Sequence, residues 1–574
     1  MPNTQGAAAR FNIALSSDAT VALNGSKTVG GMVFTSAIND YTIDAGTGGS
    51  LIFDDTTGTA SLDIFSGTHT IAANVTLTDT LDTLTTNATD SLTLSGVVSG
   101  AGGITKTGAG NLILSGTNTF GGNVSLSGGQ TTFTSGSLGA GTNLALNNAG
   151  LIYATGNTND ITAKTVTLGA GTATINTNGN NVTFANAING DGALTKTGDG
   201  TLTLAGVNGF LGNLTITQGA VKLGNGAATG EVVAEIINNS VLQLDLLDST
   251  PADVTVFNTI SGTGSLQHLG TGTTALNGAN TFTGDTTIAT GGTLKLANNL
   301  ALQNSTLQYP SAGGSLSFGP LTNATIGNLT GSKNLALANA AEIPGAVALT
   351  IGGNNTSTTY SGILSGAGSL TKTGTGVLTL SGLNTYAGAT AVNNNGQMIL
   401  DATAGIASSA LTVSQNATFT VDGGSAAISG ATTVTNAGTT APKLIVNSGT
   451  AAFTGGLFGT GNQNSAYLIA LNGGTVSAGN VTLGRTNQGL TAEPTTGSTT
   501  QGLYVNGGAF TIAGDIISAN TNSSINIRMD SGSITVAGVT TIGLNNGGRW
   551  SVMDVAGGDF QSTNAATGVV LGSN

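Results

Sequence analysis

Lysine recurs at one position of a repeated segment, which makes it the first candidate for chemistry. Lys106, Lys196 and Lys372 hold this position in three copies, and His268 holds it in a fourth. A spaced row of cations along one face would bind an acidic polymer. The alternative is an outward side chain in a Thr-Lys-Thr strand that keeps the surface soluble. We favour the second interpretation and therefore predict that these lysines point to solvent.

An asparagine and an aromatic residue recur in the same four copies, two residues apart. Exposed asparagines could contact sugars, but at a turn the asparagine side chain bonds the local backbone and tolerates left-handed conformations. The aromatic rings could form a carbohydrate platform, or could pack over a corner of the fold. We predict the structural role for both sets. The asparagines are Asn118, Asn208, Asn280 and Asn384, and the aromatic residues are Phe120, Phe210, Phe282 and Tyr386.

One short segment is similar to a piece of the secreted serine proteases. Asp530-Ser531-Gly532-Ser533 matches their D-S-G-S sequence, which would make Ser531 a nucleophile. A catalytic triad also needs a histidine, and it is recognised by geometry rather than by sequence. The chain has only His69 and His268, neither in a matching context. Because neighbouring repeats carry Asn-Gly-Gly in the same place, we interpret the match as chance.

Paired carboxylates were the other candidates for catalysis, since polysaccharide lyases and hydrolases cluster them. Asp54 and Asp55 are adjacent, which on a strand would direct them to opposite faces. Asp245 and Asp248, three apart, would diverge in the same way. Calcium-binding repeats and phosphate-binding loops are absent from the sequence, and without cysteine there is no thiol chemistry. We therefore predict no catalytic, metal or cofactor-binding residue, and a protein that is not an enzyme.

The elements that must hold these residues are short β-strands. In Leu202-Thr203-Leu204 and Leu378-Thr379-Leu380, aliphatic residues alternate with threonine, which places one face of each strand inward. Glycines bracket the strand at fixed offsets, as corners with positive φ or close backbone approach require. The stretch Gly230–Ser249 contains little glycine, but its valines and isoleucines favour strands over a helix. We place the prolines Pro310, Pro320 and Pro344 in connecting sequence.

Internal repetition decides how such strands assemble. Four copies of about twenty-four residues are in register, and repeated units of this kind bury their apolar faces by stacking on one another. A second repeat, of Asn-Gly-Gly type, begins near residue 440. The first repeats are SGAGGITKTGAGNLILSGTNTFGG (from Ser99), NGDGALTKTGDGTLTLAGVNGFLG (Asn189), SGTGSLQHLGTGTTALNGANTFTG (Ser261) and SGAGSLTKTGTGVLTLSGLNTYAG (Ser365).

Composition agrees with an all-β repeat protein. Of 574 residues 92 are glycine, and 7% are charged, against roughly 25% in an ordinary soluble domain. The net charge of −13 and the scattered basic residues argue against nucleic acid and anionic membrane as partners. No apolar run is long enough for a transmembrane helix. We predict a right-handed parallel β-helix, or β-solenoid, that forms an elongated rod, with repeat-defined segments at 1–93, 94–440 and 441–574.

The motif S-G-x-G-x-L-T-K-T-G-x-G-x-L-T-L-S-G-x-N-T-[FY]-x-G resembles the autotransporter-associated β-strand repeat. The segment from Ser365 to Gly388 matches it nearly position for position. Such repeats occur in the passenger regions of large secreted bacterial proteins. The resemblance implies a bacterial β-helix that is either attached to the outer membrane or secreted, and it says little about activity.

We therefore expect an extracellular structural or adhesive protein, such as a stalk, adhesin or fibre component. The alternative is a polysaccharide lyase or hydrolase on the same scaffold. Candidate partners are the protein itself through end-to-end stacking, surface glycans and other cells. The chain begins without a signal peptide and stops within a repeat. We accordingly expect a longer exported gene product or filament formation.

Overall fold

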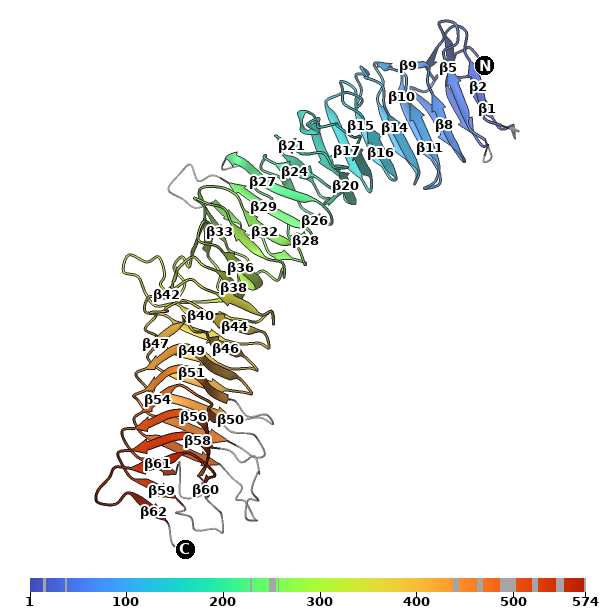
Figure 1. Cartoon of the computed structure of the whole chain (residues 1–574). Helices are drawn as coiled ribbons and strands as arrows, with labels where there is room; N and C mark the ends of the chain where they lie inside the picture. The colour runs from blue at the N-terminus through green and yellow to red at the C-terminus, as the bar shows by residue number, and fades with distance from the viewer. Residues whose placement is uncertain are drawn as a thin grey trace. The chain divides into compact units, whose positions relative to one another are not determined.

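The protein is a β-solenoid made of two units, and the computed structural model in Figure 1 describes nearly all of it. The units are Met1–Thr274 and Ala275–Asn574. The described residues are all except 14–16, 37–38, 228–229, 247–253, 257, 437–442, 462–467, 486–501, 519–524, 543–551 and 572–574. The division of the chain by repeat type at residues 93 and 440 stays a prediction.

Each strand pairs in parallel with the strand one coil further along the chain. Ile104 pairs with Val124 and Val124 with Leu144, so one coil here takes 20 residues. Near the start, Ala8 pairs with Gly31, a coil of 23 residues. The predicted parallel solenoid is confirmed. The one antiparallel contact among the described pairings is an isolated bridge between Ala338 and Ala346.

Three sides enclose the first unit. One side contains β1 (Ala8–Phe11), β4 (Gly31–Phe34), β7 (Thr59–Ile64), β10 (Thr80–Thr85), β13 (Ile104–Thr107), β15 (Val124–Ser127), β17 (Asn143–Asn147), β19 (Thr165–Leu168), β22 (Ile188–Gly190) and β25 (Gly209–Phe210). The second contains β2 (Ala19–Ala22), β5 (Tyr41–Asp44), β8 (Thr68–Ile71), β11 (Ser91–Leu94), β14 (Asn111–Leu114), β16 (Gln130–Phe133), β18 (Gly150–Tyr153), β20 (Thr172–Asn176), β23 (Ala193–Thr197), β26 (Leu214–Ile216), β28 (Ile236–Asn238) and β31 (Ile260–Ser261). The third contains β3 (Lys27–Val29), β6 (Ser50–Phe53), β9 (Asn74–Leu77) and β12 (Val98–Gly100), and later β21 (Val182–Phe184), β24 (Thr201–Leu204), β27 (Ala220–Ala227), β29 (Val241–Leu246) and β32 (Ser265–His268). A separate sheet begins with β30 (Val254–Val256) and continues with β33 (Thr273–Leu276). The division between the units falls within β33.

The second unit has the same construction. Its first strands are β34 (Thr286–Ile288), β35 (Thr293–Leu296), β36 (Leu302–Tyr309), β37 (Ser315–Ser317), β38 (Asn323–Gly331) and the pair β39 (Leu335–Ala336) and β42 (Leu364–Ser365). One side then contains β40 (Ala348–Ile351), β43 (Ser369–Lys372), β45 (Thr390–Val392), β48 (Leu411–Ser414), β50 (Thr432–Asn436), β52 (Leu457–Gly461), β55 (Val481–Arg485), β57 (Ile516–Ser518), β59 (Thr540–Ile542) and β62 (Val569–Leu571). A second contains β41 (Thr358–Tyr360), β44 (Val377–Leu380), β46 (Gln397–Leu400), β53 (Ile469–Leu471) and β60 (Val552–Val555), and a third contains β47 (Gly405–Ser408), β54 (Thr475–Ala478) and β61 (Asp559–Ser562).

Four long strands join the second and third sides of this unit: β49 (Thr418–Ile428), β51 (Lys443–Phe453), β56 (Leu503–Ile512) and β58 (Asn526–Val536). The first half of β49 pairs with β46 and its second half with β47, with a shift of register between the halves. The Asn-Gly-Gly or Asp-Ser-Gly segments of β56 and β58 fall at such shifts, where Gly508 and Gly532 have positive φ. The short strands predicted from the sequence are therefore joined into longer ones here, because glycine lets a strand bend through the corner.

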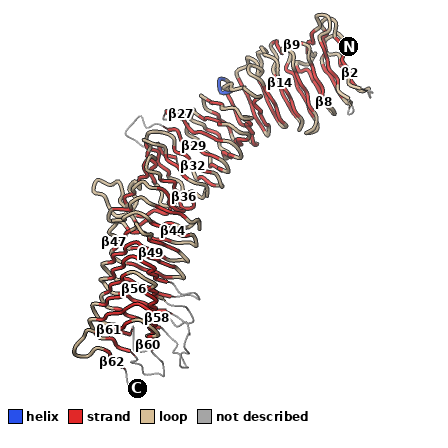
Figure 2. The backbone as a smooth tube through the Cα atoms, viewed as in Figure 1, coloured by secondary structure: helices blue, strands red, loops and turns tan. Residues whose placement is uncertain are grey.

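Strands make up most of both units, as Figure 2 shows in red. The one helical element among the described residues is a 3-10 turn, η1 (Ile161–Ala163), drawn in blue. Residues 230–249 form β28 and β29 in their described part, as predicted. Pro310, Pro320 and Pro344 lie outside strands, as predicted. Nothing among the described helices is long and apolar enough to cross a membrane.

Alternation of side chains separates interior from surface, as the sequence predicted. Leu112, Leu202 and Leu378 are fully buried, as are the leucines two residues later. Outside, threonines stack from coil to coil on one side of the second unit. The row runs through five consecutive pairings: Thr325, Thr350, Thr371, Ala391, Thr412 and Thr433. The described surface of this side is thus largely uncharged and rich in hydroxyl groups.

Corner glycines leave no room for a methyl group because successive coils touch through their backbones. A Cβ built on Gly376 would lie 2.0 Å from the carbonyl oxygen of Thr356, and its φ is not in the left-handed region. At Gly353, in the same unit, the nearest atom would be 3.6 Å away, which is ordinary contact.

These two glycines give a matched test of coil stacking. We expect Gly376→Ala to lower the unfolding free energy of the second unit by about 1–3 kcal/mol, since the coils must move apart. Gly353→Ala should leave it nearly unchanged. Urea unfolding followed by circular dichroism measures both. Equal stability of the two variants would contradict the close stacking at Gly376.

Candidate functional site

The repeated lysines lie inside the solenoid, so the predicted outward orientation is wrong. Lys106 in β13, Lys196 in β23 and Lys372 at the end of β43 are each 0% exposed. They also form no basic row on the surface, which removes the other interpretation considered for them. The strand alternation explains the direction. Each lysine follows an inward aliphatic residue by two positions, so the pleat carries it inward as well.

The ammonium groups serve as internal caps for the corner carbonyls. The Nζ of Lys106 donates to the carbonyl oxygens of Thr107 (3.2 Å) and Gly108 (2.9 Å), and to that of Gly128 in the next coil (3.2 Å). Lys196 repeats the arrangement with Thr197, Gly198 and Gln218. A lysine has three N–H donors, and here all three are used by backbone that would otherwise be buried without partners.

Lys372 and His268 also form hydrogen bonds inside the solenoid, but each has fewer partners than Lys106. Lys372 donates to the carbonyl oxygens of Thr373 and Gly374. The buried His268 ring places Nε2 3.0 Å from the hydroxyl oxygen of Thr274. Burial lowers the pKa of each lysine in the set from its ordinary 10.5 to about 8, and also lowers that of His268.

The repeated asparagines have the structural role that was predicted, but they tie neighbouring coils together instead of bonding the local backbone alone. Asn384 accepts a hydrogen bond from the backbone N–H of Leu364 (2.9 Å) and donates to the carbonyl oxygens of Gly382 and Gly405. Asn118 and Asn208 use the same scheme one coil back and one coil forward. Asn280 donates to the carbonyl oxygen of Ala301. None of the four has a positive φ, so the part of the prediction that involved left-handed backbone is not needed.

The repeated aromatic residues pack inside a corner, which confirms the structural interpretation and leaves no exposed carbohydrate platform at these positions. Phe120, Phe210, Phe282 and Tyr386 are at most 1% exposed. A Cβ on Gly139, one coil after Phe120, would lie 2.7 Å from the Phe120 ring. The Tyr386 hydroxyl lies 2.6 Å from that of Thr390, which satisfies its polar end.

Ser531 has no triad around it. Asp530 accepts hydrogen bonds from the Tyr504 hydroxyl (2.7 Å) and from Nε of Arg528 (2.9 Å), and these bonds lower its pKa. Both histidines belong to the first unit, whereas Ser531 belongs to the second. His69 is buried, accepts from the backbone N–H of Tyr41 through Nδ1, and donates from Nε2 to the carbonyl of Ser66. The Asp-Ser-Gly-Ser segment is a bent strand corner.

The paired carboxylates do not form an acid–base pair. Asp54 and Asp55 follow β6 outside any strand, just before the turn at Thr56 and Thr57, so the expected strand geometry does not apply. Asp54 accepts from Gln5, and Asp55 accepts from Thr57, whose hydrogen bonds lower its pKa. Asp245 pairs with Lys222 at 3.0 Å, while Asp248 lies outside the described residues. Within the described part of the chain, no cluster of three or more His, Asp or Glu could hold a metal ion.

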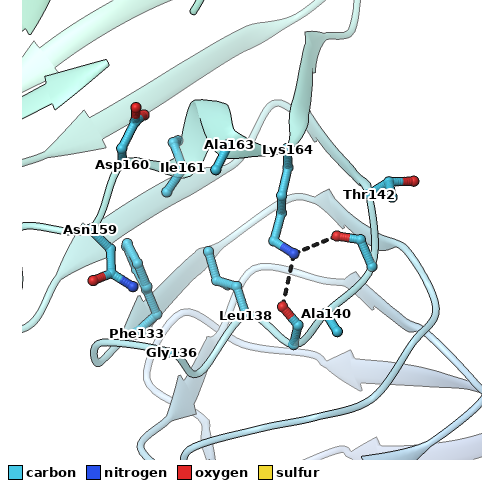
Figure 3. A pocket seen from close by; sticks show the side chains of 12 residues that line it. Phe133, Gly136, Leu138, Ala140, Thr142, Asn159, Asp160, Ile161, Ala163 and Lys164 are labelled. Carbon is cyan, nitrogen blue, oxygen red and sulfur yellow. Dashed lines mark hydrogen bonds between the residues drawn. The ribbon is translucent and has the colours of Figure 1, made fainter. Parts of the chain in front are cut away.

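A cavity of about 320 Å³ lies in the first unit, where the chain leaves the regular coil between β18 and β19. Figure 3 shows Lys164 reaching down beside Leu138 toward the backbone of residues 139–141. Its Nζ donates to the carbonyl oxygens of Gly139 (2.9 Å) and Gly141. Phe133 and Ile161 contribute apolar lining, and Asn159 lies at the edge. Burial lowers the pKa of Lys164.

Sequence reasoning missed both the interior lysines and this cavity. The lysines could have been placed by strand phase alone, because each lies two residues after an inward aliphatic residue of the same strand. For the cavity, the signal is Asp160-Ile161-Thr162, in which Asp160 accepts from the N–H and hydroxyl of Thr162 and caps η1. An aspartate followed two residues later by threonine is a local turn signature, although it does not indicate a cavity.

Comparison with known proteins places these features in a family. Four segments match the passenger-associated-transport-repeat family: residues 104–138, 194–223, 268–296 and 370–397. A curated relative, the Adhesin BmaC autotransporter of Brucella suis biovar 1 (strain 1330), is 30% identical over 238 residues, which are 39% of this chain. The chain thus carries four repeats of the passenger-associated-transport type and is similar in part to an autotransporter adhesin. It spans about 6% of the length of that relative. No solved structure matches the chain.

The passenger-associated transport repeat can now be described as a structural unit. Each matched segment begins on or at the end of the strand that carries Lys106, Lys196, His268 or Lys372, and continues through the following coil. The repeat therefore contains an interior cap, an asparagine that spans three coils and a buried aromatic ring. The resemblance found in the sequence is confirmed, and the features that recur are those that hold coils together.

Removing an interior cap should destabilise the passenger coil. We expect Lys106→Met to lower the unfolding free energy of the first unit by about 1–3 kcal/mol, because three buried carbonyl groups lose their partner. The control is Thr105→Val, which alters an outward side chain on the same strand and should change stability by no more than about 0.5 kcal/mol. Thermal and urea unfolding measure both. An equally stable Lys106→Met protein would contradict the cap.

The lowered pKa of Lys106 makes its contribution to the unfolding free energy depend on pH. The unfolded chain holds the lysine proton up to about pH 10.5, but the folded chain releases it near pH 8. Between these values the unfolded state binds more protons, so unfolding becomes less favourable as pH rises. We expect the wild type to gain stability relative to Lys106→Met from pH 7.5 to pH 10. The measurement is the difference in urea midpoint across that range, and a constant or falling difference would contradict it.

Proposed function

We propose that this chain acts outside the bacterial cell as a structural and adhesive segment of a passenger. Its similarity to a protein named an adhesin and to transport repeats of passengers supports a surface or secreted location. The observation that carries the proposal is that the repeated polar residues bind the backbone inside the solenoid. Lys106, Asn118 and their counterparts donate hydrogen bonds to the backbone of neighbouring coils. The residues that recur in the repeat therefore hold the fold together and do not form a reactive group.

The exposed surface suits weak and repeated contacts. The outward row from Thr325 to Thr433 offers hydroxyl groups at the spacing of successive strands, about 4.8 Å. Hydroxyl groups both donate and accept hydrogen bonds, as sugars do. Surface glycans and other cells are therefore the proposed partners, together with the protein itself through end-to-end stacking.

A binding assay with coated particles tests the adhesive role. We expect fluorescent beads that carry the chain to attach to glycan-bearing cells, whereas beads that carry an unrelated acidic protein of similar charge do not. Equal attachment of both kinds of bead would remove the adhesive role. In parallel, we expect no reducing ends or unsaturated products after incubation with pectin or alginate. Appearance of either product would favour the polysaccharide-active alternative.

Electron micrographs at increasing protein concentration test self-association. End-to-end stacking should lengthen the particles as concentration rises, while particles of constant length would remove this partner. Antibody labelling of intact cells of the source bacterium, before and after external protease, tests the location. Labelling that is absent from intact cells would contradict a surface position.

A further inference from the structure

The cavity beside Lys164 differs chemically from two other hollows among the described residues. Hollows of about 290 Å³ near Gln130 and about 320 Å³ near Ala427 are lined by uncharged residues alone. The cavity between β16, β18 and β19 is lined by a lysine whose ammonium group lies beside apolar side chains. Such a cation attracts an anionic group more strongly than an open surface lysine does, since less water screens it.

Lys164 differs from the interior lysines in its exposure and in the number of its hydrogen bonds. Lys106 and Lys196 are fully buried and each donates to three carbonyl groups. Lys164 remains partly exposed and donates to two, those of Gly139 and Gly141. Because an ammonium group has three N–H donors, one donor of Lys164 is left for a ligand in the cavity.

No carboxylate neutralises this lysine. Asp160 also borders the cavity, but Figure 3 shows its carboxylate turned away from it. That carboxylate accepts hydrogen bonds from Thr162 through Oδ1 and from the backbone N–H of Ala185 through Oδ2 (3.0 Å). Within the described part of the chain, the ion pairs that form involve other residues. The cavity therefore keeps a positive charge although the whole chain is acidic.

Asn159 supplies a second donor. Its Oδ1 accepts from the hydroxyl of Ser135 (2.8 Å), and its backbone carbonyl accepts from the Tyr153 hydroxyl (3.0 Å), so the residue is held at both ends. Its Nδ2 has no hydrogen-bond partner among the described residues, and Figure 3 shows this nitrogen on the side of the cavity. The polar side chains facing the cavity thus present donors, while Phe133, Leu138 and Ile161 present carbon.

We propose that this cavity binds a pyranose sugar that carries a carboxylate, such as a uronic or sialic acid unit of a surface glycan. The carboxylate lies against Lys164, a ring hydroxyl accepts from Asn159 at the opposite edge, and the C–H face of the ring lies against the apolar lining. The volume of about 320 Å³ accommodates a ligand at the small end of the range for binding sites. This inference rests on the proposed adhesive function and names the chemical class of its ligand.

The test compares sugars that differ in the carboxylate alone. The intact chain is titrated with galacturonic acid, with its neutral analogue galactose, and with N-acetylneuraminic acid, and binding is followed by saturation-transfer NMR. We expect at least one acid to bind about tenfold more tightly than galactose, as a charge-assisted hydrogen bond would provide. The acid that binds identifies the source as a uronate polymer or a sialylated glycan.

Three variants assign the binding to this cavity. Lys164→Gln should weaken binding of the acid about tenfold and leave galactose unaffected. Asn159→Asp keeps the acceptor for Ser135 but places a negative charge beside the ligand, so it should weaken binding to a similar extent without disturbing the carbonyl caps of Lys164. Thr158→Asp adds the same charge at an exposed neighbour outside the lining and should change affinity by less than about twofold, since exposed charges are screened.

Several outcomes would overturn the inference. These are no binding of either acid, equal binding of galactose and galacturonic acid, or unchanged affinity in Asn159→Asp. The adhesive function is judged separately by the coated beads. Beads that attach to cells while the chain binds neither acid would leave that function in place and remove this cavity as its site.

Discussion

A parallel coil that turns three corners every 19 to 35 residues leaves carbonyl groups pointing inward at those corners, and each of them needs a hydrogen-bond partner. Strand ladders satisfy the backbone along the sides, but they end where the chain turns. In this protein the missing donors come from side chains inside the solenoid. Lys106 and Lys196 each bind three corner carbonyls, and Asn384 bridges a coil to those on both sides of it. The rest of the architecture depends on these internal caps.

The same constraint explains why glycine and charge are distributed as they are. Where coils approach through their backbones, as at Gly376, even a methyl group would collide with the carbonyl of the coil before it. Buried ammonium groups are tolerated because carbonyl dipoles surround them, whereas an unpaired buried charge would be strongly destabilising. Outside, threonines and serines take the place of charged residues, which leaves a surface suited to many weak polar contacts. Lys164 differs from these caps because it is partly exposed and lines an apolar hollow.

A repeat protein built in this way keeps the residues of its scaffold apart from its surface. The residues that repeat, such as Asn118 and Phe120, are buried and hold coils together, so they can recur without producing a new surface each time. A departure from the repeat, such as η1 between β18 and β19, creates a local hollow that is lined by a lysine together with apolar side chains. In a solenoid of this kind, candidate binding sites are therefore to be sought where the repeat is interrupted.

By itself the sequence determined the stacked parallel coil, the short strands with their leucine interior, and the structural roles of the repeated asparagines and aromatic rings. Period-two alternation and glycines at fixed offsets are local signals, and repetition extends them over the chain. Tertiary structure alone decided where the lysine ammonium groups lie, because strand phase turns Lys106 inward but only the carbonyls of the next coil make that position stable. It also decided that β49 and β58 run through a corner, that Asp54 and Asp55 lie outside any strand, and that Lys164 lines a cavity. Each of these depends on atoms about one coil away in sequence, which no local pattern specifies.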